Sequence, residues 1–326
     1  MSYDVICLRP KSDFLNVGVT PPSELSVGYF DPNDPELAQE IKMVKALVIP
    51  AVGAKLESKM FDHSAVRFIQ VTGAGVDRVD EIGMKERDIL VSNVVGGSNQ
   101  AIAEYVVSNV LFLKRRLNFA NSEILQGNYS KVRTQLVSEN LQGLEGLTIG
   151  IIGAGTIGLA VAQAFHFMGA RIFYYDPSPK NSAALREINA RSCTLDELLH
   201  TSDVTTLHVP LTDSTKGLLG EAQLNTMKHG AILVNAARGG IVDEQALAAA
   251  ITSGQLAGAV VDVFSKEPPN DTNPLLNMDK ESSGRVLLTP HIAGVTQQSW
   301  ANLFQTAWEN VKRVLVRGES PLYRVY

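Results

Sequence analysis

The chain has 326 residues, of which 45% are hydrophobic and 19% charged, enough apolar material for two domains of roughly 150 residues each. Its 29 Lys and Arg against 34 Asp and Glu give a net charge of −5. This mild acidity disfavours a nucleic-acid partner, because such partners are held largely through phosphate contacts. The two cysteines, Cys7 and Cys193, have neither disulfide-framework nor zinc-site spacing. The N-terminus lacks a basic region before a long apolar stretch, so we expect no secretory signal and a cytoplasmic location.

The first third of the chain alternates short apolar runs with more polar stretches. Such runs are typical of strands that are buried on both faces of a parallel sheet. They comprise residues 5–8, 46–49, 68–71 and 89–91. Gly96-Gly97 then precedes a helical pattern over residues 101–117, so the sequence predicts a smaller α/β domain that ends near residue 97.

A second alternation follows. Residues 147–152 predict a buried strand, apolar positions in 157–165 recur at helical spacing, and residues 171–175 predict the next strand of a βαβ unit. Further strands are predicted at residues 204–208, 231–235, 259–262 and 286–288. Asp243 is expected to cap a helix that ends at Gly254. Strands that alternate with helices predict an α/β fold with a doubly wound parallel sheet.

Residues 148–170 contain no Asp, Glu, Lys or Arg, over a length that can cross a bilayer. Four glycines in its first half and β-branched residues at its start indicate instead a strand, a tight turn and a buried helix. We therefore expect no membrane partner.

Gly153, Gly155 and Gly158 form a G-x-G-x-x-G motif that directly follows a predicted strand and opens a predicted helix. The first glycine permits the turn, the second lets the backbone approach a pyrophosphate, and the third permits close helix–strand packing. Asp176 ends the next strand, where a carboxylate accepts hydrogen bonds from ribose hydroxyls and repels a 2′-phosphate. The motif predicts NAD rather than NADP, and leaves other users of this fold, such as methyltransferases, open.

Three polar residues follow predicted strands of the same sheet: Arg238, Glu267 and His291. Arg offers a rigid fork of donors for the carboxylate and carbonyl of a 2-keto acid, and His titrates near neutrality, as an acid–base group for hydride transfer must. A carboxylate on the other ring nitrogen would fix the tautomer and favour the imidazolium form. Each residue alone also suits an ordinary loop, so position alone does not establish a triad.

Three segments around these residues resemble signatures of the D-isomer-specific 2-hydroxyacid dehydrogenases. They are residues 235–240 (NAARGG), 262–268 (DVFSKEP) and 289–294 (TPHIAG). The similarity continues, in the family's order, through residues 73–77 (GAGVD), 101–104 (AIAE), 150–153 (GIIG) and 207–212 (LHVPLT). It covers most of the chain from about residue 65 to 316, and the first 65 residues match least.

The resemblance implies hydride transfer between NAD and a small D-2-hydroxy acid or the matching 2-keto acid. It implies that Arg238 binds the carboxylate and polarises the carbonyl, that His291 is the general acid and base, and that Glu267 orients His291. Backbone groups of Ala74, Gly75 and Val76 are implied to hold the substrate carboxylate. The implied cofactor site comprises Gly153, Gly155, Thr156, Ile157, Gly158, Asp176, His208, Val209, Ala236, Arg238, Asp262 and His291. No metal is expected, because His208 has no second ligand at a supporting spacing.

The family fold implies that a C-terminal helix, residues 297–316, returns to the smaller domain. We therefore expect a flavodoxin-like substrate domain of residues 1–97 plus 296–326 and a Rossmann NAD-binding domain of residues 98–295. A homodimer through the long helix after Asn99 is a further family expectation. Because the sequence ends at Tyr326, we expect no regulatory domain of the kind that some phosphoglycerate dehydrogenases carry.

The substrate and the direction of the reaction stay open, since glyoxylate, hydroxypyruvate, pyruvate and bulkier keto acids all fit. The loop of residues 50–54 lacks Arg and Lys, which disfavours a phosphorylated substrate unless Lys55 turns inward. An alternative function is an NAD(H)-sensing corepressor of the same fold, although long disordered tails and a basic arm are missing. A formate-type dehydrogenase is a third alternative, but it would pair the histidine with glutamine in place of Glu267.

Overall fold

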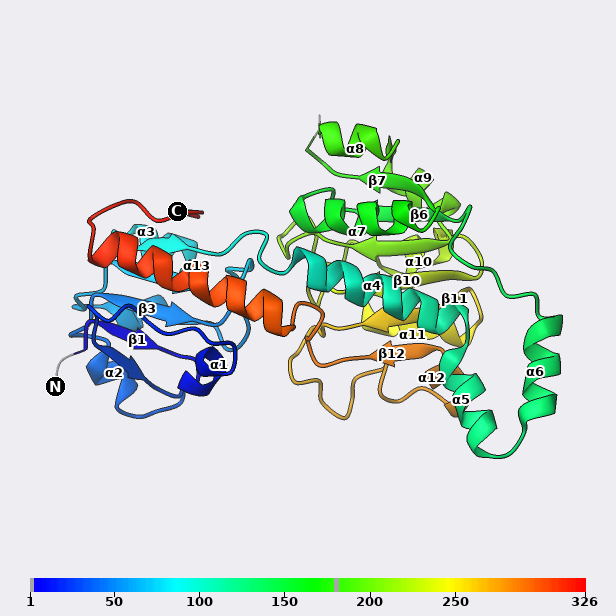
Figure 1. Cartoon of the computed structure of the whole chain (residues 1–326), viewed down its shortest axis with the longest axis horizontal. Coiled ribbons are helices and arrows are strands. Elements are labelled where there is room, and N and C mark those ends of the chain that lie inside the picture. Colours follow the sequence, from blue (N-terminus) through cyan, green and yellow to red (C-terminus); the bar gives the residue numbers. More distant parts are fainter. Residues whose placement is uncertain (1–2, 179–181) are drawn as a thin grey trace. The chain divides into compact units, whose positions relative to one another are not determined.

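The computed structural model describes residues 3–178 and 182–326. The chain divides into two compact units, Met1–Ser98 with Val295–Tyr326 and Asn99–Gly294. Each unit is built on a parallel sheet flanked by helices (Figure 1). The predicted fold class, two parallel-sheet α/β domains, is therefore confirmed.

The smaller unit has a five-stranded parallel sheet in the order β2-β1-β3-β4-β5. Its strands are β1 (Val5–Cys7), β2 (Val27–Tyr29), β3 (Ala46–Ile49), β4 (Phe68–Val71) and β5 (Leu90–Ser92). All four predicted apolar runs form strands here. The edge strand β2 was not predicted, because it is only three residues long and its outer positions are half-exposed.

Helices cover both faces of this sheet and bury two separate apolar clusters. They are α1 (Lys11–Leu15), α2 (Leu37–Glu40), the 3-10 helix η1 (Ser58–Phe61), α3 (Glu81–Lys85) and α13 (Gln297–Leu315). The C-terminal helix α13 packs on β3 and β4 and buries Phe304, Trp308 and Val311 against Phe14. Its amphipathic pattern thus joins the C-terminal residues to the N-terminal sheet.

The larger unit has a seven-stranded parallel sheet in the order β12-β11-β10-β9-β6-β7-β8. Its strands are β6 (Thr148–Ile152), β7 (Arg171–Tyr175), β8 (Arg191–Ser192), β9 (Val204–Leu207), β10 (Ala231–Asn235), β11 (Leu256–Val261) and β12 (Val286–Leu288). The chain runs from β6 outward to β8, then crosses back to β9 on the other side of β6. This reversal of direction between β6 and β9 is where doubly wound sheets bind their ligands.

Helices also cover both faces of the larger sheet. They are α4 (Asn99–Lys114), α5 (Leu117–Leu125), α6 (Tyr129–Ser138), α7 (Thr156–Phe167), α8 (Ala183–Glu187), α9 (Leu195–Thr201), α10 (Glu221–Thr226), α11 (Glu244–Thr252) and α12 (Lys280–Ser283). Helices α4 and α7 pack together over one apolar cluster, and α9, α10 and α11 contribute to the other. Asp243 caps α11 as predicted, since its Oδ1 accepts from the N–H groups of Gln245 and Ala246.

Two sequence expectations need adjustment. The helix predicted over residues 101–117 ends at Lys114, because Arg116 adopts a left-handed conformation (φ 50°) before α5 begins. The uncharged residues 148–170 form β6, the glycine turn and α7, but α7 is only half-buried and Phe167 is 88% exposed. Among the described helices, none combines the length and apolar character needed to span a membrane.

Candidate active site

The three predicted catalytic side chains follow three adjacent strands of the larger sheet. Arg238 comes three residues after β10, Glu267 stands in the loop after β11, and His291 comes three residues after β12. Because β10, β11 and β12 are parallel neighbours, their carboxyl ends lie along one edge. The topology thus brings together loops that are more than 20 residues apart in sequence.

His291 and Glu267 form a hydrogen-bonded pair. The distance between Nδ1 of His291 and Oε2 of Glu267 is 2.9 Å, and the side chains are 26% and 29% exposed. The other oxygen, Oε1, accepts from the backbone N–H of Phe264 at 3.0 Å. Burial alone would raise the pKa of Glu267, but the bonds to His291 and Phe264 and the charge of Arg238 outweigh burial and lower it. The carboxylate is therefore ionised at neutral pH and accepts from the imidazole.

The turn that carries Arg238 is fixed by the buried side chain of Asn235 at the end of β10. Asn235 Oδ1 accepts from the N–H of Ala237 (3.2 Å), and its Nδ2 donates to the carbonyl of Arg238 (3.0 Å). Gly239 then passes so close to the Glu267 loop that a Cβ there would lie 1.8 Å from the carbonyl oxygen of Phe264. Glycine at this position lets the Arg238 turn pack against that loop.

The loop of His291 is held by Asp262, which is fully buried directly after β11. Its Oδ1 accepts from the N–H of Ile292 and its Oδ2 from the N–H of Ala293, both at 2.8 Å. His291 itself has φ 56°, a left-handed conformation that costs a non-glycine residue about 1–2 kcal/mol. Asp262 was predicted to belong to the cofactor site, a role that stays a prediction. In this structure its carboxylate fixes the backbone beside His291.

The glycine turn between β6 and α7 has the geometry that the motif predicts. Gly153 has φ 92°, and a Cβ on it would lie 2.6 Å from the carbonyl oxygen of His208. A Cβ on Gly158 would lie 1.9 Å from the carbonyl oxygen of Gly153, so the third glycine sets the helix–strand approach. At Gly155, in contrast, a Cβ would meet no described atom within 4 Å. The second glycine therefore borders open space at the N-terminus of α7.

Asp176 lies against this turn. Its Oδ2 accepts from the N–H of Ala154 at 2.9 Å and its Oδ1 from the N–H of Ser178 at 2.9 Å. An open space beside Gly155, the N-terminus of a 12-residue helix and an adjacent carboxylate together fit a dinucleotide with free ribose hydroxyls.

His208 directly follows the neighbouring strand β9 at this edge of the sheet. Burial lowers its pKa to about 3, so the imidazole is neutral, and its Nε2 lies 3.0 Å from Oγ1 of Thr206. A Cβ at Gly153 would also lie 2.6 Å from Cγ1 of Val209, so both residues border the turn. Within the described part of the chain, no group of three or more His, Cys, Asp and Glu could hold a metal ion.

In the smaller unit, the predicted substrate residues Ala74, Gly75 and Val76 follow β4 in an exposed to half-buried loop. Asn93 fixes this loop, because its Nδ2 donates to the carbonyl of Ala74 at 2.6 Å. Whether these residues meet a substrate stays a prediction.

Sequence reasoning missed Arg78 in the same unit. Arg78 is 4% exposed, and it donates through Nε to the carbonyl of Ala54 (2.8 Å) and through Nη1 to that of Pro50 (3.0 Å). The loop of residues 50–54 contains no Arg or Lys, but the guanidinium of Arg78 is bonded to its backbone, whereas Lys55 is exposed. Arg78 directly follows the matched GAGVD segment, but nothing local in the sequence indicates its partners.

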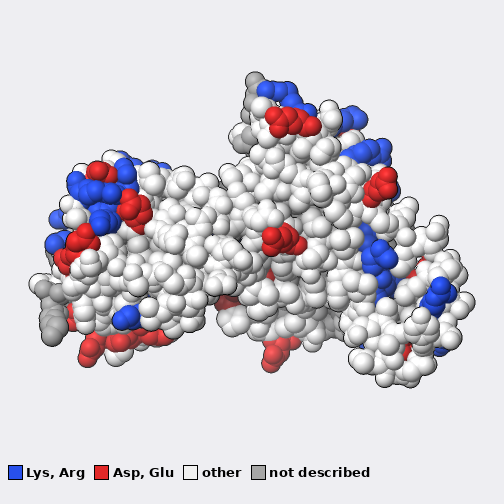
Figure 2. Space-filling view, in the orientation of Figure 1, with Lys and Arg blue, Asp and Glu red and all other residues white. Residues whose placement is uncertain are grey.

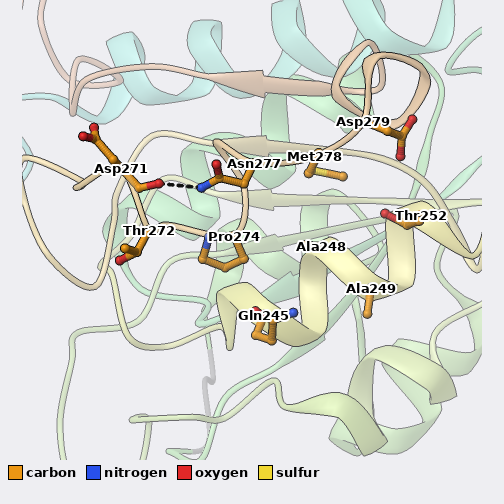
Figure 3. Close-up of a pocket in the computed structure, with 10 residues that line it drawn as sticks. All are labelled: Gln245, Ala248, Ala249, Thr252, Asp271, Thr272, Pro274, Asn277, Met278 and Asp279. Atoms are coloured by element: carbon orange, nitrogen blue, oxygen red, sulfur yellow. Dashed lines mark hydrogen bonds between the residues drawn. The ribbon is translucent and has the colours of Figure 1, made fainter.

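A pocket of about 710 Å³ lies beside α11, apart from the predicted site residues (Figure 3). It is lined by Gln245, Ala248, Ala249, Thr252, Asp271, Thr272, Pro274, Asn277, Met278 and Asp279. Asn277 Nδ2 donates to the carbonyl of Asp271 within its rim. The pocket carries none of the three predicted catalytic side chains, so we do not assign the chemistry to it.

A family model described as "D-isomer specific 2-hydroxyacid dehydrogenase, NAD binding domain" matches residues 107–293, more than half of the chain. The chain belongs to this family. The matched residues 107–293 lie in the larger unit, which therefore contains the NAD-binding domain of the family, and the predicted cofactor, NAD, is confirmed at this level.

The chain is similar to dehydrogenases that are named for several different substrates. It is 35% identical to a D-3-phosphoglycerate dehydrogenase of Archaeoglobus fulgidus, over 85% of this chain and 50% of the relative. It is 36% identical to an (S)-sulfolactate dehydrogenase of Chromohalobacter salexigens, over 83% of this chain and 85% of the relative. A D-lactate dehydrogenase of Aquifex aeolicus, solved with NAD and lactic acid, superimposes with a TM-score of 0.83 at 27% identity, covering 97% and 96% of the two chains. The chain thus spans about half the length of some curated relatives, including the phosphoglycerate dehydrogenase.

Proposed function

We propose that this dehydrogenase interconverts a small 2-keto acid and the matching D-2-hydroxy acid with NAD(H). The observation that carries the proposal is the His291–Glu267 pair beside the Arg238 turn, on the sheet edge that also holds the glycine turn and Asp176. The NAD-binding family model and the dehydrogenase relatives support it.

Arg238 is proposed to bind the substrate carboxylate and polarise its carbonyl. A guanidinium keeps its charge at any working pH and offers paired N–H donors to a planar carboxylate. The Asn235 bonds and the close approach at Gly239 hold its turn rigidly, which preserves the orientation of the donors. Backbone groups of Ala74, Gly75 and Val76 are proposed as further contacts of the carboxylate.

His291 is proposed to move the proton. With Nδ1 donating to Glu267, Nε2 is the nitrogen left to protonate the substrate oxygen in reduction and to deprotonate the hydroxyl in oxidation. The ionised Glu267 fixes this tautomer and stabilises the imidazolium that reduction consumes.

The cofactor residues are proposed to be those of the glycine turn, Asp176 and the strand ends. Bound NAD(H) supplies or accepts the hydride. Gly155 and the N–H groups at Thr156 and Ile157 would face the pyrophosphate, and Asp176 would hold the ribose. His208, Val209, Ala236 and Asp262 complete the proposed set.

A homodimer is proposed through α4 and the two helices that follow it. All residues of α5 are at least partly exposed, and α6 buries only Val132 among its described residues. The exposed apolar side chains on these helices are Leu117, Ile124, Leu125, Tyr129 and Val137. Figure 2 shows a mostly uncharged surface over α4 and α7 on this face of the larger unit. Helices α5 and α6 form an arm that exposes these apolar side chains, which fits burial against a second copy. The cytoplasmic location stays a prediction.

The proposal is tested by NADH and NADPH oxidation against glyoxylate, hydroxypyruvate, pyruvate and 3-sulfopyruvate. We expect turnover of at least one keto acid with NADH preferred, a loss of roughly 10²–10³-fold in Arg238→Ala and roughly 10²–10⁴-fold in His291→Ala. A wild type that binds NADH and turns over none would favour the NAD-sensing alternative. Full activity in His291→Ala would contradict the acid–base assignment.

A further inference from the structure

A chain of three hydroxyl and carboxyl groups runs from α4 to the loop of His291. The Tyr105 hydroxyl lies 2.6 Å from Oγ1 of Thr289, and Thr289 Oγ1 donates to Oδ1 of Asp262 at 2.5 Å. Asp262 then accepts from the N–H groups of Ile292 and Ala293, the two residues directly after His291. All members of this chain belong to the larger unit.

The direction of these bonds follows from the chemistry of the groups. The Asp262 carboxylate is only an acceptor, and it accepts three hydrogen bonds. The Thr289 hydroxyl has one proton and donates it to this carboxylate. Tyr105 must therefore be the donor to Thr289. Burial raises the pKa of Tyr105 to about 12, which keeps the phenol protonated and able to donate at any working pH.

The Asp262 carboxylate needs these donors. Asp262 is fully buried, and burial raises its pKa, whereas the bonds from Thr289, Ala293 and Ile292 act in the opposite direction. Its main chain is also tied into the site: its carbonyl accepts from the N–H of His291 at 2.8 Å. If the hydrogen bonds of Asp262 were weakened or reoriented, the backbone of His291 could therefore leave its strained left-handed conformation.

We propose that Tyr105 is a positioning residue for the dehydrogenase reaction, which acts through Thr289 and Asp262 to hold the backbone of His291 in its left-handed conformation. This inference rests on the function proposed above. The proposed role of Tyr105 involves no contact with substrate or cofactor. It is to set the position of the His291 imidazole relative to Glu267. The proposal explains why a polar hydroxyl is directed from α4 into the apolar interior beside β12.

The first test compares Tyr105→Phe with wild type and with Thr201→Val, a control that removes an exposed hydroxyl from helix α9 of the same unit. We expect kcat for keto acid reduction to fall about 5-fold in Tyr105→Phe, the effect of one lost hydrogen bond, with NADH affinity and KM unchanged. The kinetic isotope effect with 4-deuterated NADH should rise, because a misplaced His291 slows the chemical step. Thr201→Val should match wild type. Wild-type kcat in Tyr105→Phe would overturn the proposal.

The second test asks whether Tyr105 acts through Thr289. Thr289→Val should lower kcat more than Tyr105→Phe does, by on the order of 30-fold, because it leaves both Tyr105 and Asp262 without a partner at this position. Thr289→Ser keeps the hydroxyl and should retain most of the wild-type kcat. Tyr105→Phe should then add no further loss in the Thr289→Val background. Equal losses in both backgrounds would overturn the route through Thr289.

A third readout does not depend on turnover. The N–H groups of His291, Ile292 and Ala293 are all bonded to Asp262, so hydrogen exchange of a peptide covering residues 286–294 should speed up in Tyr105→Phe and stay at the wild-type rate in Thr201→Val. Wild-type exchange there in Tyr105→Phe would refute the positioning role. A wild type inactive on every keto acid would refute the proposed function alone, since this exchange measurement still tests Tyr105.

Discussion

At the scale of single residues, the proposed catalytic side chains depend on polar neighbours that do no chemistry. Asn235 fixes the turn of Arg238, and Asp262 fixes the loop of His291. Glu244 accepts from the N–H of Ser265 at 2.6 Å, beside the loop of Glu267. His291 and Glu267 are themselves about a quarter exposed, so their precision comes from these fixed backbones.

Glu267→Gln is expected to move the high-pH fall of keto acid reduction to lower pH. Reduction consumes a protonated His291, and the glutamine amide keeps a hydrogen-bond acceptor but loses the negative charge that stabilises imidazolium. Because the pKa of Glu267 lies below its usual range, its own titration does not contribute to this limb. The measurement is kcat/KM from about pH 5 to pH 10, with NADH affinity as the control. An unmoved profile would show that Glu267 does not act on the proton.

At the scale of elements, the turn between β6 and α7 separates two roles of glycine. Gly158 lies where the helix meets the strand, and no side chain fits there. Gly155 has an ordinary φ of −73° and open space beside it, so its lack of a side chain is not needed for folding. Gly158 holds the element together, and Gly155 leaves room for a ligand.

Alanine at these two positions should therefore have different effects, one on stability and one on NADH binding. Gly158→Ala places a Cβ 1.9 Å from a carbonyl oxygen, so we expect a loss of about 1–3 kcal/mol in the free energy of unfolding and a lower Tm. Gly155→Ala should keep the wild-type Tm and lose NADH affinity by at least about tenfold, since 1.4 kcal/mol suffices for that factor. Thermal unfolding and NADH fluorescence titration measure both. Tight NADH binding by Gly155→Ala would contradict the assignment of the pyrophosphate site.

At the scale of the whole molecule, helices α5 and α6 pack on each other, and most of their surface stays exposed. Apolar side chains on such an arm cost solubility unless a partner covers them. A second copy is the partner that we propose, and the mild net charge of −5 offers little electrostatic resistance to self-association.

Leu125→Glu is expected to convert the dimer to a monomer. Leu125 is 79% exposed in the single chain, and the proposed interface would bury the charge that replaces it. Ile82→Glu is the matched control, since Ile82 is 70% exposed on α3, far along the chain from the arm. Light scattering at micromolar concentration measures both. A monomeric wild type, or a Leu125→Glu variant that stays dimeric, would refute the proposed interface.

The sequence by itself determined most of the architecture, because the relevant signals are local. Buried parallel strands are continuous apolar runs, so 231–235 and 286–288 could be placed to the residue. The edge strands β2 and β8, three and two residues long, lack such runs and were missed. The glycine turn and the three polar residues after strands were also visible in the sequence, since parallel topology alone places them on one edge.

Only the tertiary structure decided how that edge is held. The bonds from Tyr105 to Thr289 and from Arg78 to the loop of residues 50–54 join positions that are 184 and more than 20 residues apart. A buried polar side chain finds its partner only after packing has excluded water, and any nearby carbonyl or hydroxyl can satisfy it. No periodicity or motif records that choice, so the groups that act were visible in the sequence and the groups that position them were not.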